Sequence, residues 1–448
     1  GGTINGVKYK GVDTDMVKVA VLGGGIAKGT GATATVGPAN TTINGGTING
    51  HVVAGGLADG DTATVGTANL TIKGGEINGS VYAGGAALGG DEATVDNFDV
   101  RIMRGTITKD VVAGNYTGDT GASTFTLLGA SPYSGGSSKG SITIGGDAAI
   151  GGKVDASAEG VATNVIIDGA DAEVTGGYEG NKDSTLTFNN YDTKFDNTAT
   201  GFGYLNVAEG SNVEMDNLST GKKDGNVTGF FGSENGNDIT VTGEGTVTAT
   251  NVNVDGNKTL TVADGGTLVA ESLTTAASST AKTEGLGSTL VIGNTGENAL
   301  GSINNGSLSS TVGSEIKFTG LGESVAASDI TKKLQGDSTG IVNVGDTKVD
   351  GLSELVKDGE VDYSKWSTDG ITNNELKKAT LTGVNSAVDK TGSFGSAQLA
   401  TGTELTVGIN GNLTLTGLDS SSSNFVSTSE GKKAGAAIAD NATLTLGD

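Results

Sequence analysis

The chain has 448 residues with 79 Gly, two Pro, one Trp, one His and no Cys, and aromatic residues make up only 4%. So few bulky side chains cannot fill the several cores of a globular enzyme of this length, and the lack of Cys excludes a disulfide scaffold. The formal net charge is −24, which excludes nucleic acid as a partner because phosphate binding requires a basic surface.

The first predicted elements are short strands of a degenerate repeat. Ile48, Ile77 and Ile107 stand at equivalent places in the motif Gly-Gly-Thr-Ile-Asn-Gly and its variants. The period is about 29–30 residues, which lies in the range of solenoid repeats. Each unit holds three runs of alternating apolar and polar residues, separated by corners rich in Gly, Asn or Asp. This rhythm predicts a solenoid in which the three isoleucines form one inward stack.

One interval of the repeat is too long. The motif opens the chain at Gly1 and does not recur until Gly45, so that this interval holds roughly half a unit more than the others. We expect the extra residues between Val7 and Lys18, because a corner of a solenoid can lengthen without disturbing the strands that pair above and below it. The strands on either side should therefore keep their register.

Alternating β-branched residues continue far along the chain, as at 239–241, 247–254 and 260–262. Such regular alternation argues against disorder, which the abundance of Gly, Ser, Thr and Asn would otherwise suggest. The many Asn-Gly pairs leave open a string of β-sandwich modules joined by hairpins. The spacing of the glycines favours the solenoid, because a sandwich has larger inward residues and modules of about 100 residues.

The texture of the sequence divides the chain into four regions: a β-helix with clear repeats over 1–150, a β-helix with irregular repeats over 151–322, an inserted subdomain over 323–390, and C-terminal β-helix rungs over 391–448. The insert is predicted to be small and helical or mixed. Its segments 327–334, 352–357 and 373–378 have helix-like spacing and begin near residues that favour helix caps.

The insert also holds the candidate contact residues Tyr363, Lys365 and Trp366, the last being the only Trp of the chain. An exposed Trp beside a Lys is a platform for stacking a sugar or contacting a protein. The alternative is that Trp366 forms the small core of the insert, which cannot share the ladder of the solenoid. Both interpretations stay open at this point.

Catalytic and metal-binding patterns are weak. The only histidine, His51, has Ser80 at the matching position of the next unit, which favours a repeat-surface residue over a member of a catalytic triad. The only arginines, Arg101 and Arg104, are interpreted as surface decoration. The calcium-binding nonapeptide is not iterated. We therefore predict no enzyme activity, no catalytic residue, no cofactor and no metal site.

The strands and corners resemble a known family. The segments Asn-Leu-Thr-Ile-Lys-Gly-Gly at 69–75, Val-Ala-Asp-Gly-Gly-Thr-Leu at 262–268 and Asn-Ala-Thr-Leu-Thr-Leu-Gly-Asp at 441–448, together with the Cys-free acidic composition, are similar to passenger domains of bacterial autotransporters, the products of type V secretion. The resemblance implies an all-β fold, a right-handed parallel β-helix. It also implies an extracellular location on the surface of a Gram-negative bacterium, tethered by a separate outer-membrane barrel that this sequence does not contain.

Two functions follow from this resemblance. The first is a cell-surface adhesin or stalk whose rod-like β-helix mediates attachment to host or bacterial surface glycans or proteins, or self-association. The alternative is a self-assembling structural protein of a surface fibre or surface layer, that is, a homo-oligomer or polymer. The chain opens directly in the repeat and closes in a strand pattern, which fits end-to-end stacking, but a truncated chain would look the same.

Overall fold

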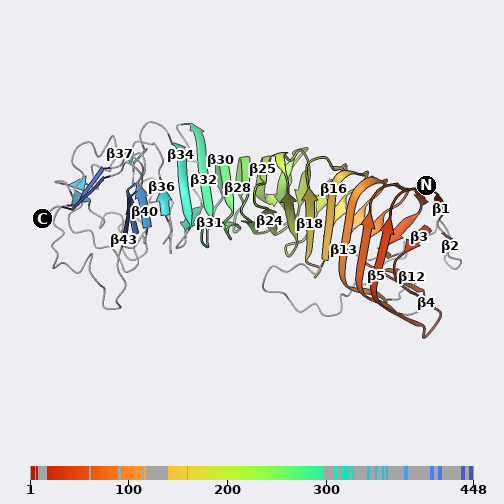
Figure 1. Ribbon diagram of the computed structural model, residues 1–448. Helices are drawn as coiled ribbons and strands as arrows, with labels where there is room; N and C mark the ends of the chain where they lie inside the picture. Colours follow the sequence, from red (N-terminus) through yellow and green to blue (C-terminus); the bar gives the residue numbers. More distant parts are fainter. Residues whose placement is uncertain are drawn as a thin grey trace. The chain divides into compact units, whose positions relative to one another are not determined.

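The computed structural model describes residues 2–5, 7–8, 18–59, 62–88, 92–113, 116–117, 140–158, 160–296, 306–310 and 314–321, together with short strands between 325 and 446. All the regular elements in these ranges are β-strands, and no helix occurs among them. The chain divides into two compact units, residues 1–213 with 222–237 and residues 214–221 with 238–448. Figure 1 shows the strands of each unit stacked as successive rungs. The all-β solenoid predicted from the sequence is confirmed.

Unit 1 contains three stacks of strands, which we call sheets A, B and C. Sheet A comprises β1 (Thr3–Asn5), β5 (Thr33–Ile43), β6 (Thr47–Asn49), β9 (Thr62–Ile72), β10 (Glu76–Ile77), β13 (Glu92–Ile107), β16 (Gly140–Ile150), β18 (Thr163–Asp168), β19 (Glu173–Val174), β21 (Thr185–Asn189) and β24 (Tyr204–Val207). Sheet B comprises β2 (Val7–Lys8), β3 (Lys18–Leu22), β7 (His51–Val53), β11 (Val81–Tyr82), β14 (Val111–Val112), β17 (Val154–Asp155), β20 (Tyr178–Glu179), β22 (Asp192–Lys194), β23 (Thr198–Thr200) and β26 (Gly229–Gly232). Sheet C comprises β4 (Ile26–Lys28), β8 (Leu57–Asp59), β12 (Ala86–Leu88) and β15 (Tyr116–Thr117).

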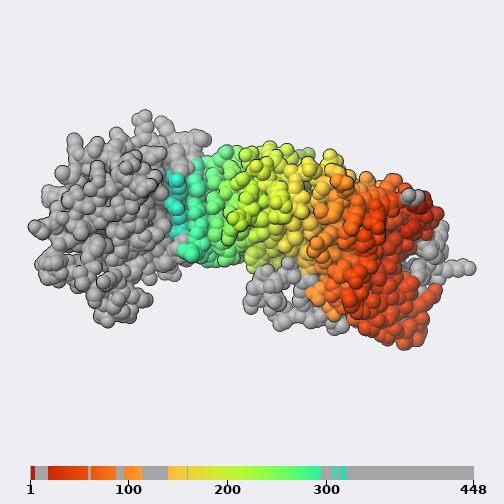
Figure 2. All heavy atoms as spheres, in the orientation of Figure 1, coloured from red at the N-terminus to blue at the C-terminus, as the bar shows by residue number. Residues whose placement is uncertain are grey.

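The repeat isoleucines form one inward stack, as predicted. Ile77 pairs in parallel register with Ile48 on one side and with Ile107 on the other, and all three are buried. The stack continues through Ile150 to Val174. Each apolar side chain therefore packs on an equivalent one in the next rung, so that a thin core is continuous through the rungs. Successive rungs of unit 1, coloured from red to yellow, lie side by side in Figure 2.

The insertion also lies where the sequence places it. Asn5 pairs with Asn49, which is 44 residues further along the chain. Leu22 pairs with Val53, so that the separation between paired residues has become much shorter by this point. The extra residues therefore fall between Asn5 and Leu22. Strands β2 and β3 pair antiparallel here, and the lengthened corner thus begins and ends as a hairpin.

Sheet C explains why the repeat becomes irregular further along the chain. Among the residues that the structure describes, its strands occur in the first rungs only, where Asn40 pairs with Asn69, 29 residues later. In later rungs Asp168 pairs with Asn189, 21 residues later. The inner side of sheet C packs on sheet B in a second small core, made by Val19, Val53, Leu57 and Ala86 with Leu22 and Tyr82 at its margin.

A cluster of aromatic side chains fills the core after sheet C has ended. The ring of Phe188 lies 4.9 Å from that of Tyr191 and 5.2 Å from that of Phe195, with edge-on geometry in both contacts, and Tyr178 lies 5.9 Å from Phe195. All four side chains are buried, and burial raises the pKa of Tyr191 to about 12. The shorter rungs have fewer inward residues, and these large rings fill the core in their place.

Glycines line the corners because neighbouring rungs approach closely there. Gly75 and Gly105 stack in successive rungs with φ of 104° and 103°. A Cβ on Gly105 would lie 2.5 Å from the carbonyl oxygen of Gly75. At another corner, a Cβ on Gly55 would lie 2.7 Å from the oxygen of Gly84 and 2.6 Å from Val95 Cγ2. The Asn-Gly pairs at Asn49 and Asn78 therefore mark corners of a solenoid and not hairpins.

Unit 2 is built on the same principle from two ladders of parallel strands. One ladder holds β27 (Ile239–Thr242), β29 (Thr259–Val262), β31 (Thr280–Thr283) and β33 (Ser307–Ser310). The other holds β28 (Thr246–Val254), β30 (Thr267–Thr275), β32 (Thr289–Gly296), β34 (Glu315–Leu321), β36 (Ile341–Asn343), β40 (Lys378–Leu381), β41 (Glu404–Val407) and β43 (Gly435–Ile438). Strand β25 (Asn212–Lys222) has residues in both units. Three small sheets complete the described strands, namely β35 (Val325–Ala326) with β37 (Val349–Asp350), β38 (Val356–Lys357) with β39 (Glu360–Val361), and β42 (Asn412–Leu415) with β44 (Thr443–Leu446).

The helical interpretation of residues 323–390 needs correction where the structure describes them. The predicted helix over 352–357 ends in strand β38, and the predicted helix over 373–378 reaches the first residue of strand β40. Strands β36 and β40 moreover continue a parallel ladder of unit 2. Helix-like spacing over so few positions is a weak signal, because so short a helix is unstable without tertiary packing. The segment 327–334 lies outside the described residues.

The isoleucine stack makes a direct prediction about stability. Ile107→Asp places an unpaired charge between Ile77 and Ile150 and should lower the free energy of unfolding by about 3–5 kcal/mol. Thr108→Asp adds the same charge at the next position, which is exposed, and should cost little. Thermal melts of the two variants followed by circular dichroism test this difference. Equal melting temperatures would contradict the register.

The corner glycines make a second prediction. Gly55→Ala should destabilise the protein by about 1–3 kcal/mol, because the added methyl group overlaps the Gly84 oxygen and Val95. Gly66→Ala is the matched control, since the nearest atom to its Cβ would be 3.9 Å away and its φ is not in the left-handed region. The control should be neutral or slightly stabilising. Urea titrations measure both effects, and equal loss of stability would show that overlap at the corner is not the cause.

Candidate functional site

The most regular surface of unit 1 is the outward side of sheet A, where equivalent residues lie next to each other in parallel register. Two rows run across the strands from β5 to β21, and we call them together the polar face. One row consists of Asn40, Asn69, Asp99, Ser141, Asn164 and Thr185, and the other of Thr42, Thr71, Arg101, Thr143, Ile166 and Thr187.

Buried residues fix this face from beneath. Between the two rows runs an inward row in which Leu70, Val100, Ile142, Val165 and Leu186 are fully buried. Because side chains alternate along a strand, the outward residues cannot change sides without exposing this core. The backbone ladder spaces neighbouring members of a row by about 4.8 Å.

Hydrogen bonds between rungs hold several side chains of the polar face. Asn69 Nδ2 donates to Asn40 Oδ1 at 2.8 Å, and Ser141 Oγ donates to Asp99 Oδ1 at 2.8 Å. Thr187 Oγ1 donates to Asn164 Oδ1 at 2.7 Å. These bonds restrict rotamers before any ligand arrives, which lowers the entropy cost of binding.

Two cations lie at the polar face of this acidic protein, and one of them is paired with a carboxylate. Arg101 Nε donates to Asp99 Oδ2 at 2.9 Å, and the Arg101 side chain is 59% exposed. Lys73 is also exposed and follows Ile72, the residue that pairs with Ile102 beside Arg101. Arg101 therefore lies on β13, and Lys73 lies directly past the end of the neighbouring strand β9.

Arg104 lies on the same strand but past a change of register between Ile102 and Arg104. Its Nε is 3.5 Å from Asp147 Oδ2, and both side chains are at least 70% exposed. Both arginines are therefore surface residues, as expected from the sequence. They do not form one site, because the change of register between β13 and β16 separates them.

His51 occupies the position that the sequence predicts, since Val52 pairs with Val81 and His51 therefore lies beside Ser80. The histidine is half-buried, however, and its ring contacts residues of neighbouring positions. Its Nδ1 accepts a hydrogen bond from the Ser80 backbone N–H at 3.0 Å, and its ring meets Tyr82 edge-on with centroids 5.6 Å apart. Burial, and secondly the positive charge of Lys109, lower the pKa of His51 below its ordinary value.

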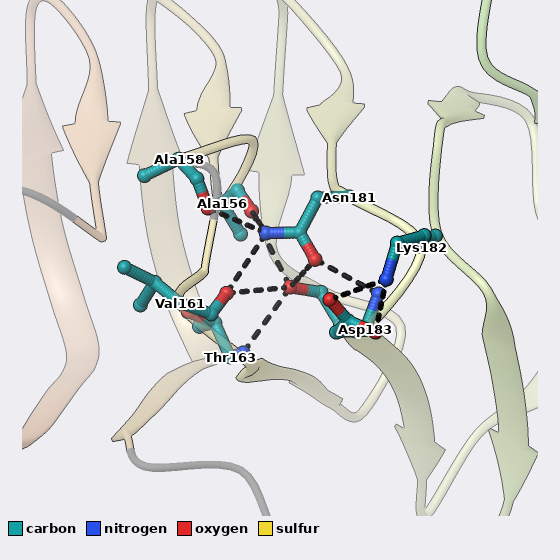
Figure 3. A network of polar contacts seen from close by, with 8 residues as sticks. Ala156, Ala158, Val161, Thr163, Asn181, Lys182 and Asp183 are labelled. Carbon is teal, nitrogen blue, oxygen red and sulfur yellow. Dashed lines mark hydrogen bonds and ion pairs between the residues drawn. The ribbon is translucent and has the colours of Figure 1, made fainter. Parts of the chain in front are cut away.

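Figure 3 shows a second polar cluster, at a corner of unit 1. Asn181 Nδ2 donates to the backbone oxygens of Ala156, Ala158 and Val161 at 3.3, 2.6 and 2.8 Å. Ser184 Oγ accepts from the Thr163 backbone N–H at 3.1 Å. These donors and acceptors meet across two rungs, although the buried hydroxyl of Thr163 has no partner, and we assign the cluster a structural role.

Ion pairs join the rungs of sheet B in a similar way. Lys153 Nζ lies 3.0 Å from Asp155 and also contacts Glu179 of the next rung. Burial acts against the charge of Lys153, but its bonds to Glu179 and Asp155 outweigh that effect and raise its pKa. The lysine is thus held by its two carboxylates.

The candidate contact residues Tyr363, Lys365 and Trp366 lie outside the described residues, so that their role stays a prediction. Within the described ranges, no three or more His, Asp or Glu side chains group closely enough to hold a metal ion. No helix in that part of the chain is long and apolar enough to cross a membrane.

Sequence reasoning did not find the polar face, although its signal is present. Asn40 and Asn69 are 29 residues apart and lie at outward positions of the repeat, as do Thr42 and Thr71 at the same separation. The next step of the first row, from Asn69 to Asp99, keeps the repeat period, but the step after it, from Asp99 to Ser141, spans 42 residues. The regular period therefore fails at this point, and pattern matching at that period loses the row.

Comparisons with known proteins identify no relative of this chain. No family model matches the chain, and neither a curated protein nor a solved structure is found to be similar to it.

The environment of His51 predicts a pH effect on stability. Because its folded pKa is lowered, its stabilising contribution is complete above the ordinary value of 6.5 and is lost as the pH falls through the folded pKa. His51→Ser, which copies Ser80 of the next unit, removes this titration. Melting temperatures of the native chain and the variant between pH 7.5 and 5 should therefore diverge, with the native chain losing more stability in acid. Parallel curves would contradict the prediction, since all other titrating groups are shared.

Proposed function

We propose that this chain is a cell-surface attachment protein, the exported part of an autotransporter-like protein of a Gram-negative bacterium, and that it binds surface glycans through the polar face. The single observation that carries this proposal is the register of the outward rows. Asn, Asp, Ser, Thr and Arg side chains recur there at about 4.8 Å intervals above a buried apolar row.

The chemistry of this face suits a sugar. Hydroxyl, amide and carboxylate groups provide both donors and acceptors, and sugar hydroxyls can use both. Several of these side chains are already held by hydrogen bonds between rungs, so that binding costs little side-chain entropy. The Cys-free acidic composition and the parallel solenoid support the autotransporter-like origin. Contacts through Tyr363, Lys365 and Trp366 remain a further part of this proposal.

A bead assay tests the attachment function. Beads coated with the purified chain should bind cultured host cells and a glycan array above the level of uncoated beads. Thr143→Trp covers the centre of the polar face and should reduce binding at least about tenfold, whereas Thr106→Trp, an exposed position of strand β13 past the change of register, should not.

Two results would count against the proposal. If coated beads bind neither cells nor glycans while the chain forms fibres or sheets in negative-stain images at rising concentration, the self-assembling structural function replaces it. If both tryptophan variants reduce binding equally, the polar face is not the contact surface.

A further inference from the structure

The environment of Arg101 differs from that of the other side chains on the polar face. In the row that contains it, Thr71 lies beside it in one neighbouring rung and Thr143 in the other. A single guanidinium therefore interrupts a row of hydroxyls. Ile166 follows Thr143 in the same row, about two rung spacings from Arg101.

Two contacts orient the guanidinium. Asp99, two positions earlier on the same strand, accepts from Arg101 Nε through one carboxylate oxygen and from Ser141 Oγ through the other, at 2.9 and 2.8 Å. The carboxylate is thus fixed from two rungs and in turn fixes Nε. Arg101 Nε is the atom that pairs with Asp99, and the side chain is 59% exposed, so that the guanidinium is accessible to a ligand.

We propose that Arg101 is the centre of a binding site for an acidic sugar, a glycan unit that carries one carboxylate. A forked pair of N–H donors matches the two oxygens of a carboxylate, and such charge-assisted bonds are stronger than neutral ones. Thr71 and Thr143 offer hydroxyls on either side to the sugar ring, and Ile166 offers an apolar surface to a ring placed over Thr143 and beyond. Lys73, directly past the end of the adjacent strand β9, adds a second positive charge.

The net charge of the chain favours a ligand with one negative charge over a polyanion. A chain with a formal charge of −24 repels a polyanion as a whole, and this repulsion grows with each charge on the ligand. A glycan with one carboxylate among neutral sugars gains the local attraction of Arg101 and Lys73 with the smallest such cost. The proposal rests on the proposed glycan-binding function and names the class of sugar that the same face would select.

A pair of sugars tests the site directly. Isothermal titration of the full chain with 3′-sialyllactose and with lactose compares ligands that differ by one carboxylate-bearing unit. We expect at least about tenfold tighter binding of 3′-sialyllactose, the size that a charge-assisted hydrogen-bonded contact provides. Added salt should weaken this preference, because the contact is exposed.

Matched variants assign the effect to one residue. Arg101→Gln should abolish the preference, whereas Arg104→Gln, which removes the same charge from the same strand past the change of register, should keep it. Arg101→Lys should keep only part of it, since an ammonium retains the charge but not the fork. Equal melting temperatures of the variants confirm that each one is folded, as expected for exposed ion pairs.

The outcomes separate this site from the broader function. The site is overturned if the native chain binds both sugars equally, if it binds neither, or if Arg101→Gln leaves the preference intact. It is also overturned if both glutamine variants lose the preference equally, because general electrostatics would then explain it. If the site fails in one of these ways while coated beads still bind cells through the polar face, the attachment function stands without it.

Discussion

The parallel backbone ladder between successive rungs is the interaction on which the rest of this structure depends. Parallel pairing in register brings each residue next to its equivalent one rung away, so that Ile77 lies between Ile48 and Ile107. The ladder also satisfies the backbone polar groups, which removes the need for a thick core. Small and β-branched residues are therefore sufficient inside, and glycine is required where corners stack, as at Gly75 and Gly105.

Those parts of the fold that repeat locally could be predicted from the sequence. The isoleucine stack, the register of the early rungs and the position of the first insertion all follow from spacing alone. The end of sheet C and the aromatic cluster around Phe188 could not be predicted in this way. They depend on which rungs lie above and below a given residue, and this is not visible once the period changes. Val356, Lys357 and Lys378, the described residues of two segments with helix-like spacing, lie in strands, so that a short local pattern did not indicate the ladder there.

The candidate functional residues also differ in whether the sequence alone could identify them. His51 attracts attention in the sequence because it is unique, yet the structure places it half-buried against Ser80 and Tyr82, in contacts that support the rungs. Arg101 appears as decoration in the sequence, yet its partner Asp99 is held by Ser141, which lies far along the chain and meets it only through the register of β13 with β16. Uniqueness in the sequence therefore points to His51, whereas position in the ladder points to Arg101. Only Arg101 has an arrangement of neighbours that supports a binding site.

A solenoid surface faces a specific problem in recognition. A face with identical residues in every rung offers a ligand many equivalent positions, each shifted by about 4.8 Å, so that binding has no defined register. Inward positions cannot break this degeneracy, because each must pack on its equivalent in the next rung. Outward positions can, and a single charged side chain among hydroxyls is enough to make one position differ in energy from its neighbours. On the polar face that difference lies at Arg101, flanked by Thr71 and Thr143, which is why we place the proposed selection of one ligand at this departure from the repeat.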